Sequence, residues 1–436
     1  MSALALPAGR KTRAMTVTAS VASPDYKAVR AVAAAAIGNA LQWFDFVAYG
    51  FFAVTIGKLF FPAADERMSL LLALASFGVT FFMRPFGAVV LGAYADRRGR
   101  KSGFMLTILL MLAGTAIIAV APTYPTAGLL APALIVSGRL LQGFAAGAEF
   151  GSATAFLAEQ NPQRRGFFAS WQFASQGLTT ILATAFGATL ASSLTPGQIA
   201  SWGWRLPFIF GLLIGPVAYY IRRHVEETAE FRSVALSNKP LREVISGGKE
   251  RLLISFGVII LCNVAMYTVL FMPTYAAQQL GLPAAGGFLA GLVTGAMQVL
   301  LIPIVGAFTD RHGRVPIAVA STVALLLAVY PMFAWLAAVP TLQTLLTVQA
   351  ILGILLSGYM GGLPALMSEL FPTATRTTGL SISYALSAAI FGGFAPFLDA
   401  WLIDVTGSKL APSFYLMLAA LISLTALLAA RRAGAR

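Results

Sequence analysis

The stretch GAYADRRGRK, residues 92–101, places one aspartate and four basic residues directly after a long apolar run. A second stretch, GAFTDRHGR at residues 306–314, repeats the order glycine, aspartate, arginine, glycine, arginine after another apolar run. The stretch EQNPQRR at 159–165 likewise resembles ELFPTATR at 369–376. The members of each pair lie in different halves of the chain. The sequence therefore indicates a duplicated unit of several helices.

The composition is that of a membrane protein. Of the 436 residues, 58% are hydrophobic and 11% are charged, whereas about 25% are charged in soluble domains. A helix needs roughly 20 apolar residues to cross a hydrocarbon core of about 30 Å. Twelve such runs occur, at residues 30–57, 67–95, 102–122, 127–158, 167–194, 202–223, 251–279, 285–309, 315–338, 343–368, 377–404 and 410–430. We predict an all-α membrane protein with twelve transmembrane helices in two pseudo-symmetric six-helix bundles.

The polar segments between these runs predict the domain organisation. It comprises an N-terminal tail (1–29), a first bundle (30–223), a linker (224–250), a second bundle (251–430) and a C-terminal tail (431–436). Most of the 30 Lys and Arg residues lie in the tails and in alternate loops, which is the positive-inside pattern. Both termini are therefore expected in the cytoplasm. The net charge of +14 indicates topology and contact with membrane lipid, not nucleic-acid binding.

Several function classes are disfavoured by what the sequence lacks. It has one cysteine, Cys262, and two histidines, His224 and His312. No cluster of metal-ligating spacing and no phosphate-binding loop of the GxxxxGK[ST] type is present. We therefore expect no metal, no cofactor, no enzyme activity and no ATP-driven pump.

At this point the chain resembles a known family along almost its whole length. The stretch at 92–101 looks like the signature loop of the major facilitator superfamily, and RLLQG at 139–143 resembles its proton-coupling motif. Further stretches are similar to the metabolite:proton symporter subgroup: QWFDFVAYG (42–50), FFP (60–62), RPFG (84–87), EFG (149–151), WGWRLPF (202–208) and FGGFAP (391–396). Within that subgroup, the stretch from MRP (83–85) to GAY (92–94) and the stretch from SWQ (170–172) to SQ (175–176) resemble the citrate and tricarballylate carriers. The resemblance implies the major facilitator fold, alternating access, a bacterial-type cytoplasmic (inner) membrane and, as we expect, a monomer.

Four ionisable residues lie in the middle of predicted spans: Asp45, Arg84, Arg139 and Glu149. A charge at mid-bilayer costs at least about 2.5 kcal/mol, so such residues are functional candidates. Other acids, namely Asp399, Asp404, Glu159 and Glu369, are expected nearer the ends of their spans, where water has access.

Helical geometry predicts which of these side chains share a face. At 100° per residue, Arg139, Gln142 and Glu149 fall within an arc of about 80°, and Asn39, Gln42, Asp45 and Tyr49 within about 120°. We expect both stripes to face one cavity between the bundles. Gly143, Gly147 and Gly151 form a separate stripe suited to close helix packing.

The charged residues have two alternative roles each. Arg84 and Arg139 are candidates for binding substrate carboxylates, because a guanidinium grips a carboxylate at two points. Alternatively, each is a structural partner of Asp45 or Glu149. Asp45 and Glu149 are candidate proton carriers, and the sequence does not choose between them.

Polar residues from several spans are candidates to complete the substrate site. They are expected to line its walls or, alternatively, to form hydrogen bonds between helices. The candidates are Asn39, Gln42, Tyr49, Gln172, Gln176, Tyr267, Tyr359 and Tyr384.

The repeated charged stretches are predicted to be conformational gates rather than ligands. Their glycines allow helices to approach closely, and their aspartates can cap a helix N-terminus or pair with arginine. The predicted gate residues are Gly92, Asp96, Arg97, Gly99, Arg100, Glu159, Asp310, Arg311, Arg314, Glu369 and Arg376.

The resemblance and the buried charges together predict a secondary active transporter. The favoured function is proton-coupled import of a small di- or tricarboxylate, with citrate or tricarballylate first. The alternatives are proton symport of a shikimate-like monocarboxylate, 2-oxoglutarate or a zwitterionic osmolyte and, more remotely, a nutrient sensor that does not transport.

Overall fold

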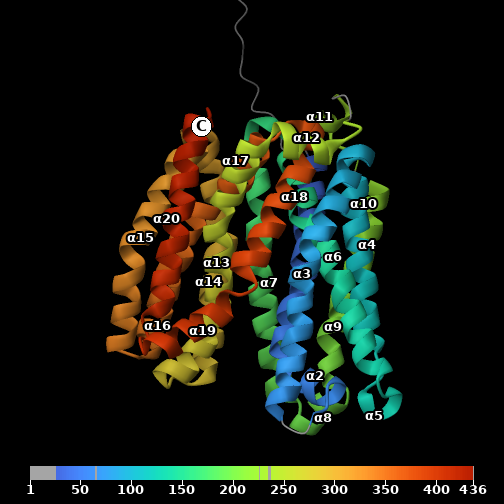
Figure 1. Cartoon of the computed structure of the whole chain (residues 1–436), viewed down its shortest axis with the longest axis vertical. Helices are drawn as coiled ribbons and strands as arrows, with labels where there is room; N and C mark the ends of the chain where they lie inside the picture. Colours follow the sequence, from blue (N-terminus) through green and yellow to red (C-terminus); the bar gives the residue numbers. More distant parts are fainter. Residues whose placement is uncertain (1–25, 64–65, 225, 234–236, 436) are drawn as a thin grey trace, which may run out of the picture.

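The computed structural model describes residues 26–63, 66–224, 226–233 and 237–435, and no strand occurs among them. The predicted N-terminal tail at 1–29 lies mostly outside these residues. Figure 1 shows two groups of long helices side by side. The first group comprises α1 (Tyr26–Phe51), α2 (Ala53–Phe60), α3 (Glu66–Arg98), α4 (Arg100–Val120), α5 (Tyr124–Ala127), α6 (Leu130–Ala158), η1 (Pro162–Arg164), α7 (Arg165–Ser193), α8 (Pro196–Ser201), η2 (Gly203–Arg205), α9 (Leu206–Gly211) and α10 (Ile214–His224).

Two short helices of the linker, α11 (Ala229–Arg232) and α12 (Pro240–Gly247), lie at the top of Figure 1. The second group comprises α13 (Lys249–Leu280), α14 (Ala284–His312), α15 (Arg314–Ala338), α16 (Leu342–Met360), α17 (Leu363–Leu370), η3 (Thr373–Thr375), α18 (Arg376–Ser387), the π-helix η4 (Ala388–Gly392), α19 (Ala395–Thr406) and α20 (Ala411–Arg432). Helix α1 begins and α20 ends at the top of Figure 1, which we call the terminal face; the other end is the opposite face.

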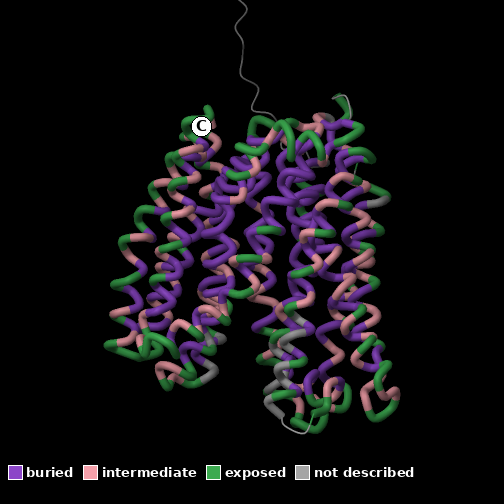
Figure 2. The backbone as a smooth tube through the Cα atoms, viewed as in Figure 1, coloured by how far each residue is buried: buried purple, intermediate pink, exposed green. Residues whose placement is uncertain are grey.

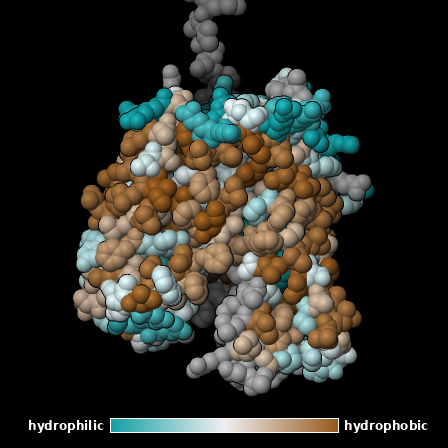
Figure 3. Space-filling view, in the orientation of Figure 1, coloured by the Kyte–Doolittle hydropathy of each residue, from teal (hydrophilic) through white to brown (hydrophobic). Residues whose placement is uncertain are grey.

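Among the described residues, 11 helical segments are long and apolar enough to cross a membrane. The predicted span at 167–194 is not among them, although it corresponds to α7, which has 29 residues. Gln172, Gln176 and several hydroxyl residues lower the hydropathy of α7. Figure 3 shows, on the face in view, a largely hydrophobic region between more hydrophilic ends. These features identify an all-α integral membrane protein.

Several predicted spans are interrupted helices, and two of them belong to the second group. The span at 343–368 consists of α16 and α17, which are separated at Gly361 and Gly362. The span at 377–404 consists of α18, the π-helix η4 and α19. A π-helical turn inside an α-helix is often found at functional positions. Of these two breaks, η4 lies near the middle of its span, whereas Gly361 and Gly362 lie nearer the terminal-face end of theirs.

The repeated stretches adopt the same local structure in both groups. Gly99 joins α3 to α4 with φ +114, and Gly313 joins α14 to α15 with φ +88. These backbone conformations are costly for any residue with a Cβ. The repeated glycine is therefore required by the tight turn between consecutive helices.

The two groups meet closely near the terminal face. A Cβ added to Gly306 on α14 would lie 2.6 Å from the carbonyl oxygen of Gly166 on α7, and one added to Gly92 would lie 3.2 Å from Cα of Thr378 on α18. Figure 2 shows buried backbone running across both groups in this region, whereas their ends separate toward the opposite face. The groups are thus joined at one face and apart at the other.

A cavity lies between the groups. Its walls come from both groups and include Trp43, Gln176, Tyr267, Gln298 and Met360. Further lining residues include Thr184, in the half of α7 toward the opposite face, and Gly287, close to the start of α14 at that face. The cavity therefore extends from mid-depth toward the opposite face.

Candidate functional site

The four predicted intramembrane charges are all buried, as expected. Asp45, Arg84, Arg139 and Glu149 are at most 2% exposed. They do not form one cluster, however. The pair Arg84 and Glu149 lies where the two groups of helices meet, and the pair Asp45 and Arg139 lies inside the first group.

Arg84 lies at the boundary between the two groups. It is carried by α3, and its Nη1 donates a hydrogen bond to the Tyr267 hydroxyl on α13, at 3.3 Å. Its guanidinium carbon is 4.3 Å from the ring centroid of Phe81 and 5.4 Å from that of Trp43. Its Nε and Nη2 are buried and have no hydrogen-bond partner among the described residues. Arg84 therefore has donors available for an acceptor that enters the site.

Glu149 lies on α6 beside Arg84, with which it interacts electrostatically, and the Trp43 indole hydrogen-bonds to it. Its Oε1 is buried without a partner in the described structure. The next residue, Phe150, stacks on Tyr384 of α18 with centroids 4.3 Å apart. The Tyr384 hydroxyl likewise has no partner in the described residues. Groups from five helices thus converge on one buried point between the halves.

The second pair belongs to a hydrogen-bonded chain inside the first group. Arg139 Nη1 donates to Gln142 Oε1 at 2.7 Å, Gln142 Nε2 donates to the Thr115 hydroxyl at 3.0 Å, and Thr115 donates to Asp45. A Cβ on Gly211 of α9 would lie 2.0 Å from Asp45 Oδ1. Asp45 therefore points toward α4 and α9, and the expectation that it faces a cavity shared with all four charges is wrong.

The other members of the predicted stripe on α1 also meet different neighbours. Asn39 Nδ2 donates to Ser175 Oγ at 2.6 Å and to the Gln172 carbonyl at 3.0 Å, and Gln172 Nε2 donates back to Asn39 at 3.2 Å. Tyr49 and Ser76 share a hydrogen bond of 2.5 Å. Gln42 is buried, and its Oε1 lacks a partner in the described structure. Asn39 and Gln172 therefore tie α1 to α7.

Asp96 is the centre of one predicted gate at the terminal face. It accepts hydrogen bonds from the backbone amides of Thr377 and Thr378, at 3.1 and 2.8 Å, and pairs with Arg100. These amides belong to the first turn of α18, where unpaired N–H groups favour an anion. The aspartate of the first half therefore caps a helix of the second half, which is one of the two roles predicted for it.

Asp310 forms the matching gate with the halves exchanged. It accepts from the amides of Gly166 and Phe167 at the start of α7, at 2.7 and 3.0 Å. Arg314 lies 3.3 Å from Asp310 and 3.0 Å from Glu369. The pseudo-symmetry predicted from the repeated stretches therefore extends to their partners.

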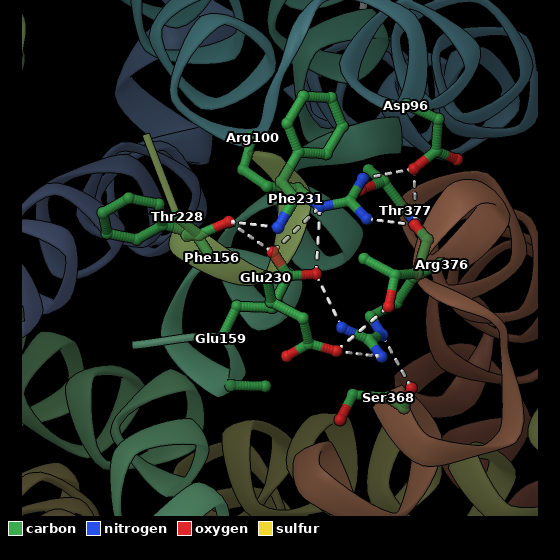
Figure 4. A network of polar contacts seen from close by, with 12 residues as sticks. Asp96, Arg100, Phe156, Glu159, Thr228, Glu230, Phe231, Ser368, Arg376 and Thr377 are labelled. Carbon is green, nitrogen blue, oxygen red and sulfur yellow. Dashed lines mark hydrogen bonds and ion pairs between the residues drawn. The ribbon is translucent and has the colours of Figure 1, made fainter. Parts of the chain in front are cut away.

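Glu159 connects the gate to the linker, as Figure 4 shows. It pairs with Arg100 at 3.1 Å and with Arg376 at 2.6 Å, and it accepts from the Thr228 hydroxyl at 2.6 Å. Glu159 is 3% exposed, so the expectation that water reaches it is wrong. The linker and both arginines cover it. Two other predicted gate residues, Arg97 and Arg311, are exposed at the terminal face.

Glu230 of the linker was not predicted as a gate residue. It lies 2.8 Å from Arg165 and 2.9 Å from Arg376, one in each half. Burial raises the pKa of Glu230, but the charges of Arg376 and Arg165 outweigh burial and hold its pKa below the usual value. The sequence does not distinguish Glu230 from the other acidic residues of the linker, which are Glu226, Glu227, Glu243 and Glu250.

Comparison with known proteins gives the family. The sugar (and other) transporter model matches residues 31–235, and the Major Facilitator Superfamily model matches residues 291–434. A citrate-proton symporter of Klebsiella pneumoniae is 38% identical over 89% of this chain and 88% of its own length. The chain belongs to the major facilitator superfamily. It is a transporter, not an enzyme.

Other major facilitator proteins are also similar to this one. A citrate-proton symporter of Salmonella typhi is 39% identical over 89% of this chain and 91% of its own length. A proline/betaine transporter of Escherichia coli (strain K12) is 30% identical, covering 95% and 86%. The solved proton:xylose symporter XylE superposes with a TM-score of 0.70 over 92% of this chain and 94% of its own, at 16% identity. The fold prediction is confirmed.

Within this major facilitator fold, the three candidate tyrosines differ in position. Tyr267 lines the cavity and Tyr384 lies behind it. The Tyr359 hydroxyl donates to the backbone carbonyl of Val258 inside the second group, so it is not brought to the cavity. Gln176 lines the cavity with both amide atoms buried and unpartnered among the described residues.

Asp399 corrects another expectation about this transporter. It was placed near the outer end of its span, with access to water, but it is 0% exposed. Helices α13 and α20 pack against α19 and cover it. Asp404, five residues further on, is exposed as expected.

Proposed function

We propose that this protein imports a small di- or tricarboxylate, with citrate or tricarballylate first, together with protons. The observation that carries the proposal is Arg84, a buried charge between the halves with two N–H groups that lack an acceptor among the described residues. A cation at this depth is costly unless it finds a partner. A carboxylate supplies two acceptors to a guanidinium in one plane. We assign the substrate carboxylate to Arg84.

Further groups are suited to the rest of a polar substrate. Gln176 and Tyr267 line the cavity from opposite halves, and Tyr384 offers a free hydroxyl beside them. Contacts from both halves allow the substrate to stabilise a conformation in which the halves close around it. Arg139, Gln42, Asn39, Tyr49, Gln172 and Tyr359 have a weaker claim to direct contact, because each lies within one half or is hydrogen-bonded there.

We assign proton coupling first to Glu149. Arg84 stabilises the ionised form of Glu149 by its charge, and a substrate carboxylate on Arg84 competes for that charge. Substrate binding thereby favours protonation of Glu149, so proton and substrate are loaded together. Asp45 remains the second candidate. Protons are needed because moving a dianion into a negative interior costs about 4.6 kcal/mol per 100 mV.

Alternating access explains why the halves are joined at the terminal face while the cavity extends toward the opposite face. The positive-inside pattern supports a cytoplasmic terminal face and therefore cytoplasmic termini, in a bacterial-type inner membrane. The ion pairs around Asp96, Asp310 and Glu159 then hold the cytoplasmic side closed while the cavity extends outward. Transport requires these contacts to break and the outer ends to close, as in repeat-built transporters. We propose that a monomer completes this cycle.

The similar proline/betaine transporter supports a second candidate, a zwitterionic osmolyte. One carboxylate of such a substrate would also fit Arg84. The higher identity to two citrate-proton symporters, 38% and 39% against 30%, favours the carboxylate. 2-Oxoglutarate and a shikimate-like monocarboxylate are further alternatives, and a sensor without transport is the most remote.

Counterflow in proteoliposomes tests the substrate. Vesicles loaded with unlabelled citrate should accumulate labelled citrate, and external competitors should inhibit in the order citrate or tricarballylate, then 2-oxoglutarate, then shikimate and glycine betaine. Inhibition by glycine betaine but not by tricarballylate would establish the osmolyte alternative. Absence of counterflow with every compound, by protein that is folded and oriented, would favour the sensor.

A further inference from the structure

A second buried carboxylate lies in the second half of the molecule, away from Arg84. Asp399 on α19 is 0% exposed. Its Oδ2 accepts a hydrogen bond from the Thr268 hydroxyl on α13, at 2.9 Å. Its Oδ1 has no hydrogen-bond partner among the described residues, and no Lys, Arg or His in this part of the chain forms an ion pair with it.

The helices that pack against α19 provide no compensating charge. From α20, the titratable group that faces Asp399 is Tyr415, whose hydroxyl donates to the carbonyl of Phe391 at 2.9 Å. From α13, the facing polar group is the neutral hydroxyl of Thr268. An ionised carboxylate with a single neutral donor is costly to bury, whereas a protonated carboxyl is not. The environment therefore favours a carboxyl that carries a proton when the site is closed.

Asp399 is connected to the substrate cavity through adjacent residues of α13. Tyr267 accepts from Arg84, and Thr268 donates to Asp399. Consecutive helical residues differ by 100° in direction, so one side of α13 faces the cavity and the next faces Asp399. A rotation or shift of α13 that accompanies substrate binding would change both contacts.

The π-helix η4 adjoins the same two sites. A Cβ on Gly392 would lie 2.7 Å from the Tyr267 ring, and the carbonyl of Phe391 accepts from Tyr415, which faces Asp399. Asp399 begins the second turn of α19 after this interruption. The carboxylate is thus next to a break in its span, where a change of conformation can expose or cover it.

We propose that Asp399 is a second proton-binding site, which takes up and releases one proton in each transport cycle. This inference rests on the proposed function as a proton symporter. The ligand is a proton and not a metal cation, because a hard cation needs about six oxygen ligands, whereas the side-chain hydrogen bond of Asp399 among the described residues supplies one hydroxyl. Binding and release at Asp399 are coupled to the cavity through Tyr267 and Thr268.

The test measures protons taken up per labelled citrate in proteoliposomes for wild type, Asp399→Asn and Asp404→Asn. We expect Asp399→Asn to take up one proton fewer per citrate while counterflow continues, because Asn imitates the protonated acid. Asp404→Asn, an exposed acid on the same helix, should match wild type. An unchanged ratio in Asp399→Asn overturns the inference. If wild-type uptake itself is not coupled to protons, the proposed function fails instead.

Thr268→Val tests the same site without removing the acid. Loss of the donor removes a contact that stabilises the ionised carboxylate, so proton release requires a more alkaline interior. We expect the midpoint of net uptake against internal pH to shift upward while counterflow stays as in wild type. A pH profile that superimposes on that of wild type contradicts the proposal. This test does not depend on whether Asp399→Asn folds.

Discussion

Arg84 and Glu149 differ from Asp45 and Arg139 in where their partners come from. Arg84 reaches Tyr267 of the other half, whereas Asp45 is hydrogen-bonded by Thr115 within its own. A rearrangement of the two halves therefore changes the surroundings of the first pair more than those of the second. This distinction is the basis for assigning substrate and proton to Arg84 and Glu149.

Arg84→Lys should weaken citrate binding. A lysine keeps the charge but loses the planar two-point contact, and hydrogen bonds to charged groups contribute about 1.5–3 kcal/mol, which corresponds to roughly 10- to 100-fold in affinity. The KM for citrate in counterflow is the measurement. Arg205→Lys, at the opposite face, is the matched control and should leave KM unchanged. Equal KM values for both variants would exclude Arg84 as the residue that binds the substrate carboxylate.

Glu149→Gln should uncouple transport from the proton gradient. The amide resembles the protonated acid and cannot release a proton, so accumulation driven by a gradient is lost while exchange of citrate for citrate continues. Asp45→Asn, which likewise replaces an acid by its amide, is the comparison for the second candidate. Loss of accumulation in Asp45→Asn, with Glu149→Gln unaffected, would exchange the two assignments.

For the four intramembrane charges, the sequence predicts burial but not the residues that they contact. The apolar runs around Asp45, Arg84, Arg139 and Glu149 imply their burial. Their partners depend on which helix packs against each face, and helical periodicity does not contain that information. Asp399 was misjudged for the same reason: its place near a helix end suggested water, but α13 and α20 cover it.

Among the elements, two matching sets of contacts join the halves at the terminal face. Each half supplies one aspartate to the first turn of a helix in the other half, α18 or α7. The repeated stretches predict these contact residues as gates, and they contain the glycines at which the helices approach closely. The contribution of the linker, through Glu230 and Thr228, was not predicted, because its irregular path depends on the final positions of both halves.

Gly306→Ala should weaken the closed arrangement of the terminal face. The added Cβ would lie 2.6 Å from the Gly166 carbonyl oxygen, and overpacking of this kind costs about 1–3 kcal/mol. The measurement is the labelling rate of a cysteine introduced at Ser170, and we expect it to rise. Gly78→Ala is the control, because its Cβ meets nothing within 4 Å. An unchanged labelling rate would show that the close contact between Gly306 and Gly166 does not stabilise the closed terminal face.

Glu230 should contribute to the closed gate throughout the neutral range. Its pKa in the folded protein lies below the ordinary value of 4.5, so its ion pairs are present above pH 4.5 and are lost only as the pH falls through the lower value. Glu230→Gln should therefore raise the labelling rate of the cysteine introduced at Ser170 equally at pH 6 and pH 8. A difference between wild type and variant that vanishes at one of these pH values would contradict this.

The whole molecule is closed at one face and hollow toward the other. Figure 1 shows the two groups of helices side by side, and the contacts of Asp96 and Asp310 join them near the terminal face. The duplication and the number of long helices were predictable from the sequence, but the arrangement of the two halves was not. It depends on contacts between distant segments, such as Gly166 with Gly306 and Asp96 with Thr378.

Uptake of labelled citrate into proteoliposomes with and without an inward proton gradient tests the central claim most directly. We expect citrate to accumulate above its external concentration when the outside is acidic, and accumulation to cease when a protonophore dissipates the gradient. Uptake that is indifferent to the gradient and to the protonophore would contradict proton-coupled carboxylate import.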